Sequence, residues 1–256
     1  MQILLERPRP ANSQSSFGTP PILPVRVEGL RFVINGRPLI REISFSLSES
    51  LPTLLLGHNG AGKSLLLRLM HGLIAPTQGT ISWGGLSTAE AARHQAMVFQ
   101  RPVMLRRPVL DNVVYALAMR KAPRRDRRDL AMAALEEAGL AHLADRPARV
   151  LSGGEQQLVA LAQARALKPL VLFLDEPTAS LDPVHSAAVE RAIEAVVGAG
   201  IKVVMACHDL AQARRLAHDV LFLAGGRLVE HSLAETFFTT PASDTARRYL
   251  NGEIAI

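Results

Sequence analysis

The stretch TLLLGHNGAGKSLLLRLM, residues 53–70, decides the fold. It opens on an apolar run, continues through a glycine-rich loop and ends in a leucine-rich helical pattern. Residues 57–64 within it match G-x-x-x-x-G-K-[ST], the pattern of the phosphate-binding P-loop. Strand, loop and helix in this order are the context that the pattern requires. The sequence therefore predicts a P-loop NTPase core of the α/β class.

The P-loop residues predict how a nucleotide would be held. Backbone N–H groups at the glycines can curl around phosphate oxygens, and the helix that follows turns its positive N-terminal end toward them. Lys63 would reach the β- and γ-phosphates, and the Ser64 hydroxyl would bind Mg²⁺. The predicted nucleotide-binding set is Gly57, His58, Asn59, Gly60, Ala61, Gly62, Lys63, Ser64 and Leu65.

Composition limits the class of protein. The chain has 256 residues, 48% hydrophobic and 20% charged, which indicates a globular protein with a sizeable core. The single cysteine, Cys207, excludes an intramolecular disulfide. No apolar run reaches the roughly 18–20 residues that cross a bilayer, and the net charge of +6 suits an anionic partner. We therefore expect a cytoplasmic chain that reaches a membrane only through a partner.

The chain divides into segments of different composition. Residues 1–24 are rich in Pro, Ser, Gln and Asn, and we expect them to form a disordered or loosely attached extension. We expect residues 25–256 to form one domain. Helical patterns separated by prolines predict a helical subdomain, at about residues 101–165, inserted into the α/β core.

Two kinds of strand are predicted in the remaining sequence. Residues 25–34 and 38–47, separated by the turn dipeptide Asn35-Gly36, predict a hairpin in an antiparallel β subdomain. Residues 170–176 and 201–209 are apolar on both faces, as expected for parallel strands covered by helices. Further along, Ser232 and Glu235 have the spacing of a capping box at the start of a helix.

Paired carboxylates end one of these apolar strands. The sequence LFLDEP, residues 172–177, places Asp175 where ligands bind in open α/β sheets, at the carboxyl end of a strand. Asp175 would hold Mg²⁺ through water, and Glu176 would polarise an attacking water as a general base. The pair follows the P-loop by more than 100 residues, and together they predict nucleotide hydrolysis.

The motif LSGGEQQ, residues 151–157, lies between the P-loop and LFLDEP. This order of motifs resembles the nucleotide-binding subunit of ABC transporters, over about residues 25–252. The resemblance implies an ABC ATPase fold with ATP and Mg²⁺ as cofactors. It implies that Lys63, Gln100, Glu176 and His208 are catalytic and that Ser64, Gln100 and Asp175 bind the metal.

The resemblance also implies sites in a second chain. Signature residues Leu151, Ser152, Gly153, Gly154 and Glu155 would contact the γ-phosphate of ATP bound to the other copy, and the D-loop would include Ser180 and Asp182. Two copies would enclose two ATP molecules head to tail. The implied partners are an integral membrane permease and, indirectly, a substrate-binding protein, at the cytoplasmic face of the plasma (inner) membrane.

The sequence departs from the family pattern at two places. Leu65 replaces the Thr or Ser that commonly follows the P-loop Ser, which removes a hydroxyl contact worth roughly 0.5–1.5 kcal/mol. The residue that stacks on adenine has two candidates. Ile34 occupies the position by register, whereas Phe32 lies on the same strand face and is aromatic.

The cargo is predicted from resemblance alone. The stretch VFQRPVMLRRPVLDNVVYAL, residues 98–117, resembles the ATPases of tungstate and related oxyanion importers, and residues 208–238 resemble the tungstate and phosphate branch. Tungstate-type oxyanion import is favoured, with phosphate or an amino acid as alternatives. A soluble ABC ATPase acting on nucleic acid would usually carry two nucleotide modules or a long coiled-coil insertion, so we expect no nucleic acid partner.

Overall fold

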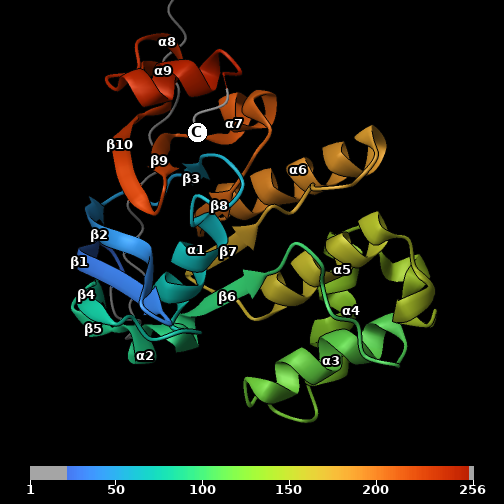
Figure 1. Ribbon diagram of the computed structural model, residues 1–256. Coiled ribbons are helices and arrows are strands. Elements are labelled where there is room, and N and C mark those ends of the chain that lie inside the picture. The colour runs from blue at the N-terminus through green and yellow to red at the C-terminus, as the bar shows by residue number, and fades with distance from the viewer. Residues whose placement is uncertain (1–21, 254–256) are drawn as a thin grey trace, which may run out of the picture.

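An antiparallel sheet forms one side of the molecule (Figure 1). The computed structural model describes residues 22–253. The sheet has strand order β2-β1-β4-β5, and Asn35 and Gly36 join its first two strands as predicted. Its strands are β1 (Val25–Ile34), β2 (Arg37–Leu47), β4 (Gln78–Trp83) and β5 (Leu86–Ser87).

The second sheet has six strands in the order β10-β9-β3-β8-β7-β6. All neighbours pair in parallel except the edge strand β10, which is antiparallel to β9. The strands are β3 (Thr53–Leu56), β6 (Gln95–Val98), β7 (Val171–Asp175), β8 (Lys202–Ala206), β9 (Asp219–Ala224) and β10 (Arg227–Leu233). Every residue of β3, β7 and β8 is buried, as the apolar runs predicted.

The register of the parallel strands places three chain segments at one edge. Ala206 of β8 lies opposite both Leu55 of β3 and Asp175 of β7. Parallel strands end at the same edge of a sheet. The P-loop, Glu176 and His208 therefore all follow these three paired residues by one or two positions.

Three helices form a separate lobe, drawn in green to yellow in Figure 1. They are α3 (Val109–Met119), α4 (Arg127–Glu137) and α5 (Gly153–Ala166), and they pack through buried aliphatic side chains such as Val113, Leu135 and Leu161. The other helices are α1 (Lys63–His71), α2 (Thr88–Ala91), α6 (Pro183–Gly198), α7 (Leu210–Leu216), α8 (Ala234–Thr239) and α9 (Asp244–Leu250). Within residues 22–253, no helix combines the length and apolarity needed to cross a bilayer.

The large sheet divides the hydrophobic core into two layers. Alternate residues of its strands point to opposite faces, so Leu54 and Leu56 join one layer while Leu55 joins the other. The Leu55 layer fills the space between the two sheets and includes Trp83, whose indole N–H donates to the Met70 carbonyl at 3.2 Å. The opposite layer extends into the α3–α5 lobe.

One local prediction is wrong, and another falls largely outside the described residues. Ser232 does not cap a helix, because β10 continues through Leu233 and the Ser232 hydroxyl donates to Glu230 Oε1 at 3.1 Å. Helix α8 begins at Ala234 without a side-chain cap. Of the extension expected at residues 1–24, only residues 22–24 are described, and Ile22 is buried in the core.

A buried polar cluster lies at the opposite, amino edge of the large sheet. The Lys202 ammonium is buried and donates to the Leu51 carbonyl and to Thr53 Oγ1. Thr53 Oγ1 donates to Asp219 Oδ1 at 2.6 Å, and Asp219 Oδ2 lies 2.9 Å from His231 Nε2. Burial lowers the pKa of Lys202 to about 8, although the nearby Asp219 and Glu49 carboxylates oppose the shift.

The lowered pKa of Lys202 makes folding depend on pH. Between pH 8 and 10.5 the folded chain binds fewer protons than the unfolded chain, so the free energy of unfolding rises with pH. We expect the titration of this lysine to raise the free energy of unfolding by at most about 3 kcal/mol between pH 8 and 10.5. Urea unfolding at several pH values should show that Lys202→Met loses this rise, whereas the exposed Lys168→Met keeps it. Parallel curves for wild type and Lys202→Met would contradict the assignment.

Candidate nucleotide-binding site

The P-loop begins with a glycine that has no room for a side chain. Gly57 has φ of +144°, and a Cβ built on it would lie 2.2 Å from the Leu223 carbonyl oxygen of β9. The loop therefore starts in close contact with the backbone of the neighbouring strand. It ends at Gly62, the N-cap of α1, and the Leu66 amide donates to the Gly62 carbonyl at 2.8 Å.

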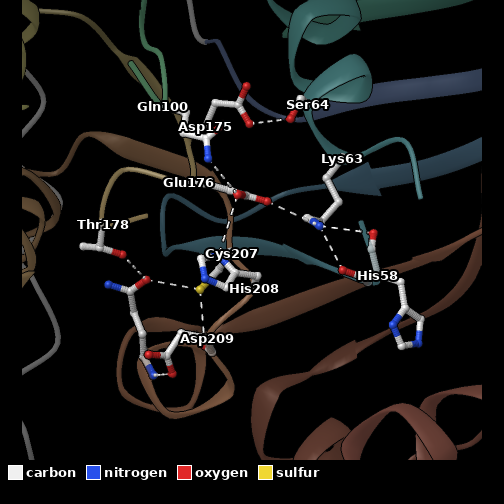
Figure 2. Close-up of polar contacts among 12 residues, drawn as sticks. His58, Lys63, Ser64, Gln100, Asp175, Glu176, Thr178, Cys207, His208 and Asp209 are labelled. Carbon is white, nitrogen blue, oxygen red and sulfur yellow. Dashed lines mark hydrogen bonds and ion pairs between the residues drawn. The ribbon is translucent and has the colours of Figure 1, made fainter. Parts of the chain in front are cut away.

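Lys63 lies buried at the centre of this loop. Its ammonium donates to the carbonyl oxygens of Gly57 at 2.9 Å and His58 at 3.3 Å. It also lies 3.5 Å from Glu176 Oε1 (Figure 2). A buried ammonium is stable only when its charge is compensated, and here two carbonyls and one carboxylate do so. The anionic oxygens of a phosphate are stronger partners than carbonyls and could replace them.

Ser64 and Asp175 form the second pair of the site. The Ser64 hydroxyl donates to Asp175 Oδ1 at 2.6 Å, and Arg68, one helical turn after Ser64, lies 3.9 Å from Asp175 Oδ2. Burial raises the pKa of Asp175, and the Ser64 hydrogen bond and the Arg68 charge partly oppose it. The predicted metal ligands Ser64 and Asp175 are thus in direct contact with each other.

The donor set fits a small hard cation. Hydroxyl, carboxylate and amide oxygens from Ser64, Asp175 and Gln100 are the ligand types of Mg²⁺. Across residues 22–253 no group of three or more His, Cys, Asp or Glu side chains could hold a metal ion by itself. In the usual magnesium site of nucleotide enzymes the protein supplies one or two ligands, and phosphate and water supply the rest.

Glu176 is the point where the polar groups converge. Its carboxylate accepts a hydrogen bond from the Gln100 side-chain amide at 3.4 Å and lies 3.6 Å from His208 Nδ1 (Figure 2). The contact with Lys63 is the third. The backbone of Glu176 has φ of +48°, a conformation that costs a non-glycine residue about 1–3 kcal/mol. Its amide donates to the Ala206 carbonyl at 3.1 Å, which holds the residue against the end of β8.

The signature packs against the start of α6, which directly follows the D-loop. Ser152 and Glu155 form a capping box at the start of α5, with the Ser152 amide 2.8 Å from Glu155 Oε2. Asp182 caps α6 by accepting from the amides of Val184 and His185, both at 2.9 Å. A Cβ on Gly154 would lie 2.3 Å from the His185 ring, so only glycine permits this approach.

The structure brings together most of the predicted site, with one exception. The P-loop, Gln100, Asp175, Glu176 and His208 surround one point (Figure 2). Residues 151–155 make no hydrogen bond or ion pair with the P-loop in the part of the chain that the structure describes. Of the two candidates for adenine stacking, Ile34 is 47% exposed and Phe32 packs partly against the core.

Sequence reasoning missed some side chains around the site. Arg68 could have been found, because residues four apart share a helix face. Tyr249 carried no such signal: its ring packs edge-on against His58, with centroids 4.9 Å apart, although the two residues are far apart in sequence. Cys207 directly precedes His208 in the sequence. Burial raises the pKa of its thiol to about 12, which keeps the thiol protonated and unreactive.

The fold and the site define a P-loop NTPase with an added antiparallel sheet and an inserted helical lobe. The profile of the family described as "ABC transporter" matches residues 40–179. The chain belongs to the ABC transporter family. It is an ATP-binding subunit, and the proteins of this class are ATPases.

Individual relatives agree with this assignment. The phosphate import ATP-binding protein PstB 2 of Natronomonas pharaonis is 34% identical over 245 residues, 89% of this chain and 86% of that protein. The tungstate uptake system ATP-binding protein TupC of Peptoclostridium acidaminophilum is 34% identical over 215 residues, 84% and 99% of the two chains. The structure of cbiO1 from Clostridium perfringens, part of the ABC transporter complex cbiONQ, superimposes with a TM-score of 0.76 at 27% identity. The superposition covers 89% of this chain and 96% of the cbiO1 chain.

The contact at Gly57 predicts a large loss of stability on substitution. Gly57→Ala should lower the free energy of unfolding by about 2–5 kcal/mol, because the methyl group adds a backbone clash to the strain of positive φ. Gly60→Ala is the matched control, since Gly60 also has positive φ, +80°, but no atom lies within 4 Å of its Cβ position. That variant should lose about 1–2 kcal/mol. Equal losses in urea titrations would show that the Leu223 contact is unimportant.

Proposed function

We propose that this chain is the ATP-hydrolysing subunit of an importer whose cargo is an oxyanion of the tungstate type. The convergence of Lys63, Gln100 and His208 on the Glu176 carboxylate supports the hydrolytic role. The similarity of residues 98–117 to oxyanion importer ATPases, and the PstB 2 and TupC relatives, support the cargo. Phosphate and amino acids are the alternatives.

Hydrolysis follows from the groups around Glu176. The Lys63 ammonium lies 3.5 Å from the Glu176 carboxylate and neutralises it. A γ-phosphate that draws Lys63 toward itself frees Glu176 to accept a proton from water. The water oxygen attacks the γ-phosphorus, the bond to ADP breaks, and Lys63 and His208 stabilise the charge on the phosphoryl oxygens. Mg²⁺ held by Ser64, Asp175 and Gln100 would neutralise the β- and γ-phosphates.

The signature supports a dimer as the active form. Ser152 to Glu155 lie at the start of α5, in the lobe that Figure 1 draws apart from α1. A second copy in a two-fold arrangement would bring its Ser152, Gly153 and Gly154 to the ATP on this P-loop. The N-terminal end of α5 would then act as a second anion site. Closing and opening of this dimer is the motion that would drive transport.

A groove beside Gln100 supports contact with a permease. It has a volume of about 390 Å³ and lies between β6, α3 and α5. Gln95 at its floor is fully buried, and neither polar atom of its side chain has a hydrogen-bond partner among residues 22–253. Val103 at its rim is 84% exposed. A permease segment that lies in this groove would cover the exposed apolar side chain of Val103. We also propose residues 25–256 as the ATP-binding domain, with the helical subdomain at about residues 101–165.

The role of Glu176 has a direct test. Glu176→Gln keeps the shape of the side chain but cannot accept a proton, so kcat for ATP hydrolysis should fall by about 10²–10⁴-fold. ATP should still bind, because the P-loop is unchanged. Glu194→Gln, at an exposed position on α6, is the control and should hydrolyse ATP like the wild type. If Glu176→Gln and wild type hydrolyse ATP at the same slow rate, the catalytic role is wrong.

The cargo requires a transport measurement. In cells from which this gene is deleted, uptake of tungstate should fall while uptake of phosphate and glutamate stays unchanged. The wild-type chain and Glu194→Gln should restore tungstate uptake, and Glu176→Gln should not. Loss of phosphate or glutamate uptake instead would reject the tungstate assignment and identify the alternative.

A further inference from the structure

The C-terminal part of the chain packs against the outside of the P-loop. The Tyr249 ring of α9 meets the His58 ring at 4.9 Å and 89°, and meets Phe222 of β9 at 5.0 Å. Tyr249 is only 8% exposed. Figure 2 shows the His58 imidazole turned away from Lys63. The aromatic contact therefore lies behind the surface that would meet a phosphate.

The β9–β10 hairpin supports the same loop from a second direction. The Gly226 amide donates to the Ala61 carbonyl at 3.2 Å, and the Gly226 carbonyl accepts from the Arg41 amide at 2.7 Å. Leu223 of β9 leaves no space beside Gly57. Hairpin and helix together contact the P-loop at its first two residues and near its end.

A buried carboxylate determines where α9 lies. Glu230 of β10 is 7% exposed and accepts from the amides of Ala242 at 3.1 Å and Ser243 at 3.0 Å. The Ser232 hydroxyl donates to it as well. Ser243 then caps α9 by accepting from the Ala246 amide at 3.1 Å. These bonds fix the start of the short helix relative to the sheet, and hence the position of Tyr249 five residues after its first residue.

Tyr249 packs against His58, and His58 is one of the two loop residues whose carbonyls bind Lys63. The ammonium is bonded to the carbonyls of Gly57 and His58. His58 Nε2 is buried and has no hydrogen-bond partner within the described chain, and the imidazole packs edge-on against Tyr249. Removing the Tyr249 ring would leave His58 free to turn, and the two carbonyls would lose their fixed direction.

We propose that Tyr249 is a positioning residue for ATP binding, whose ring fixes His58 and so prepares the P-loop for phosphate. The proposal rests on the ATP-binding role assigned to residues 57–65. It makes nucleotide affinity depend on a helix that lies far from the P-loop in the sequence. A preformed loop binds more tightly because less conformational freedom is lost on binding.

The test measures affinity for a fluorescent ATP analogue and the steady-state rate of hydrolysis. Tyr249→Leu removes the aromatic contact and should weaken binding about fivefold, the effect of one aromatic pair. The KM for ATP should rise by a similar factor while kcat stays within about twofold, since Tyr249 touches none of the groups around Glu176. Tyr249→Phe keeps the ring and should restore the affinity.

A matched variant separates positioning from general stability. Phe237 is fully buried in the same cluster and packs on Phe222 at 5.6 Å. Phe237→Leu should lower the melting temperature as much as Tyr249→Leu does and leave ATP affinity unchanged. Equal weakening by both variants, or wild-type affinity in Tyr249→Leu, would overturn the proposal. Failure of the wild-type chain to bind the analogue would instead reject the ATP site itself.

Discussion

Parallel pairing of β3, β8 and β7 is the constraint on which the site depends. The three strands are in register, so their last residues reach one edge of the sheet together. Each is buried along its length, and a shift by one residue would move every side chain of the strand into the opposite layer of the core. The packing of the three strands in the core therefore brings the P-loop, Glu176 and His208 together. The chemistry requires little more than the correct residue after each strand.

Electrostatics within this edge is a balance among four groups. The Lys63 ammonium, the Gln100 amide and His208 all approach the Glu176 carboxylate, while Asp175 is bonded to Ser64 instead. Two adjacent acids thus have different partners. Burial raises the pKa of Asp175. In the proposed mechanism a nucleotide attracts Lys63 away from Glu176, so the carboxylate proposed to react is the one whose partners can leave.

Much of this could be predicted from sequence, because the signals are local. Gly57 to Ser64 form a contiguous motif, and Asp175 and Glu176 directly follow an apolar strand. Prediction failed where the outcome depends on distant packing. Ser232 has the spacing of a helix cap, but pairing of β10 with β9 continues through it. Tyr249 lies nearly two hundred residues from His58, and no periodicity links them.

Two buried lysines lie at opposite edges of the large sheet, Lys202 at the amino edge and Lys63 at the carboxyl edge. Lys202 and Lys63 are 2% and 4% exposed. The ammonium of Lys202 is bonded to Leu51 and Thr53, groups that belong to the entrance of β3 and cannot leave while the strand is paired. Lys63 is bonded to loop carbonyls and to Glu176. A buried charge needs compensation in either place. In the proposed mechanism a phosphate takes over that compensation at the carboxyl edge, and its binding changes the charge around the Glu176 carboxylate.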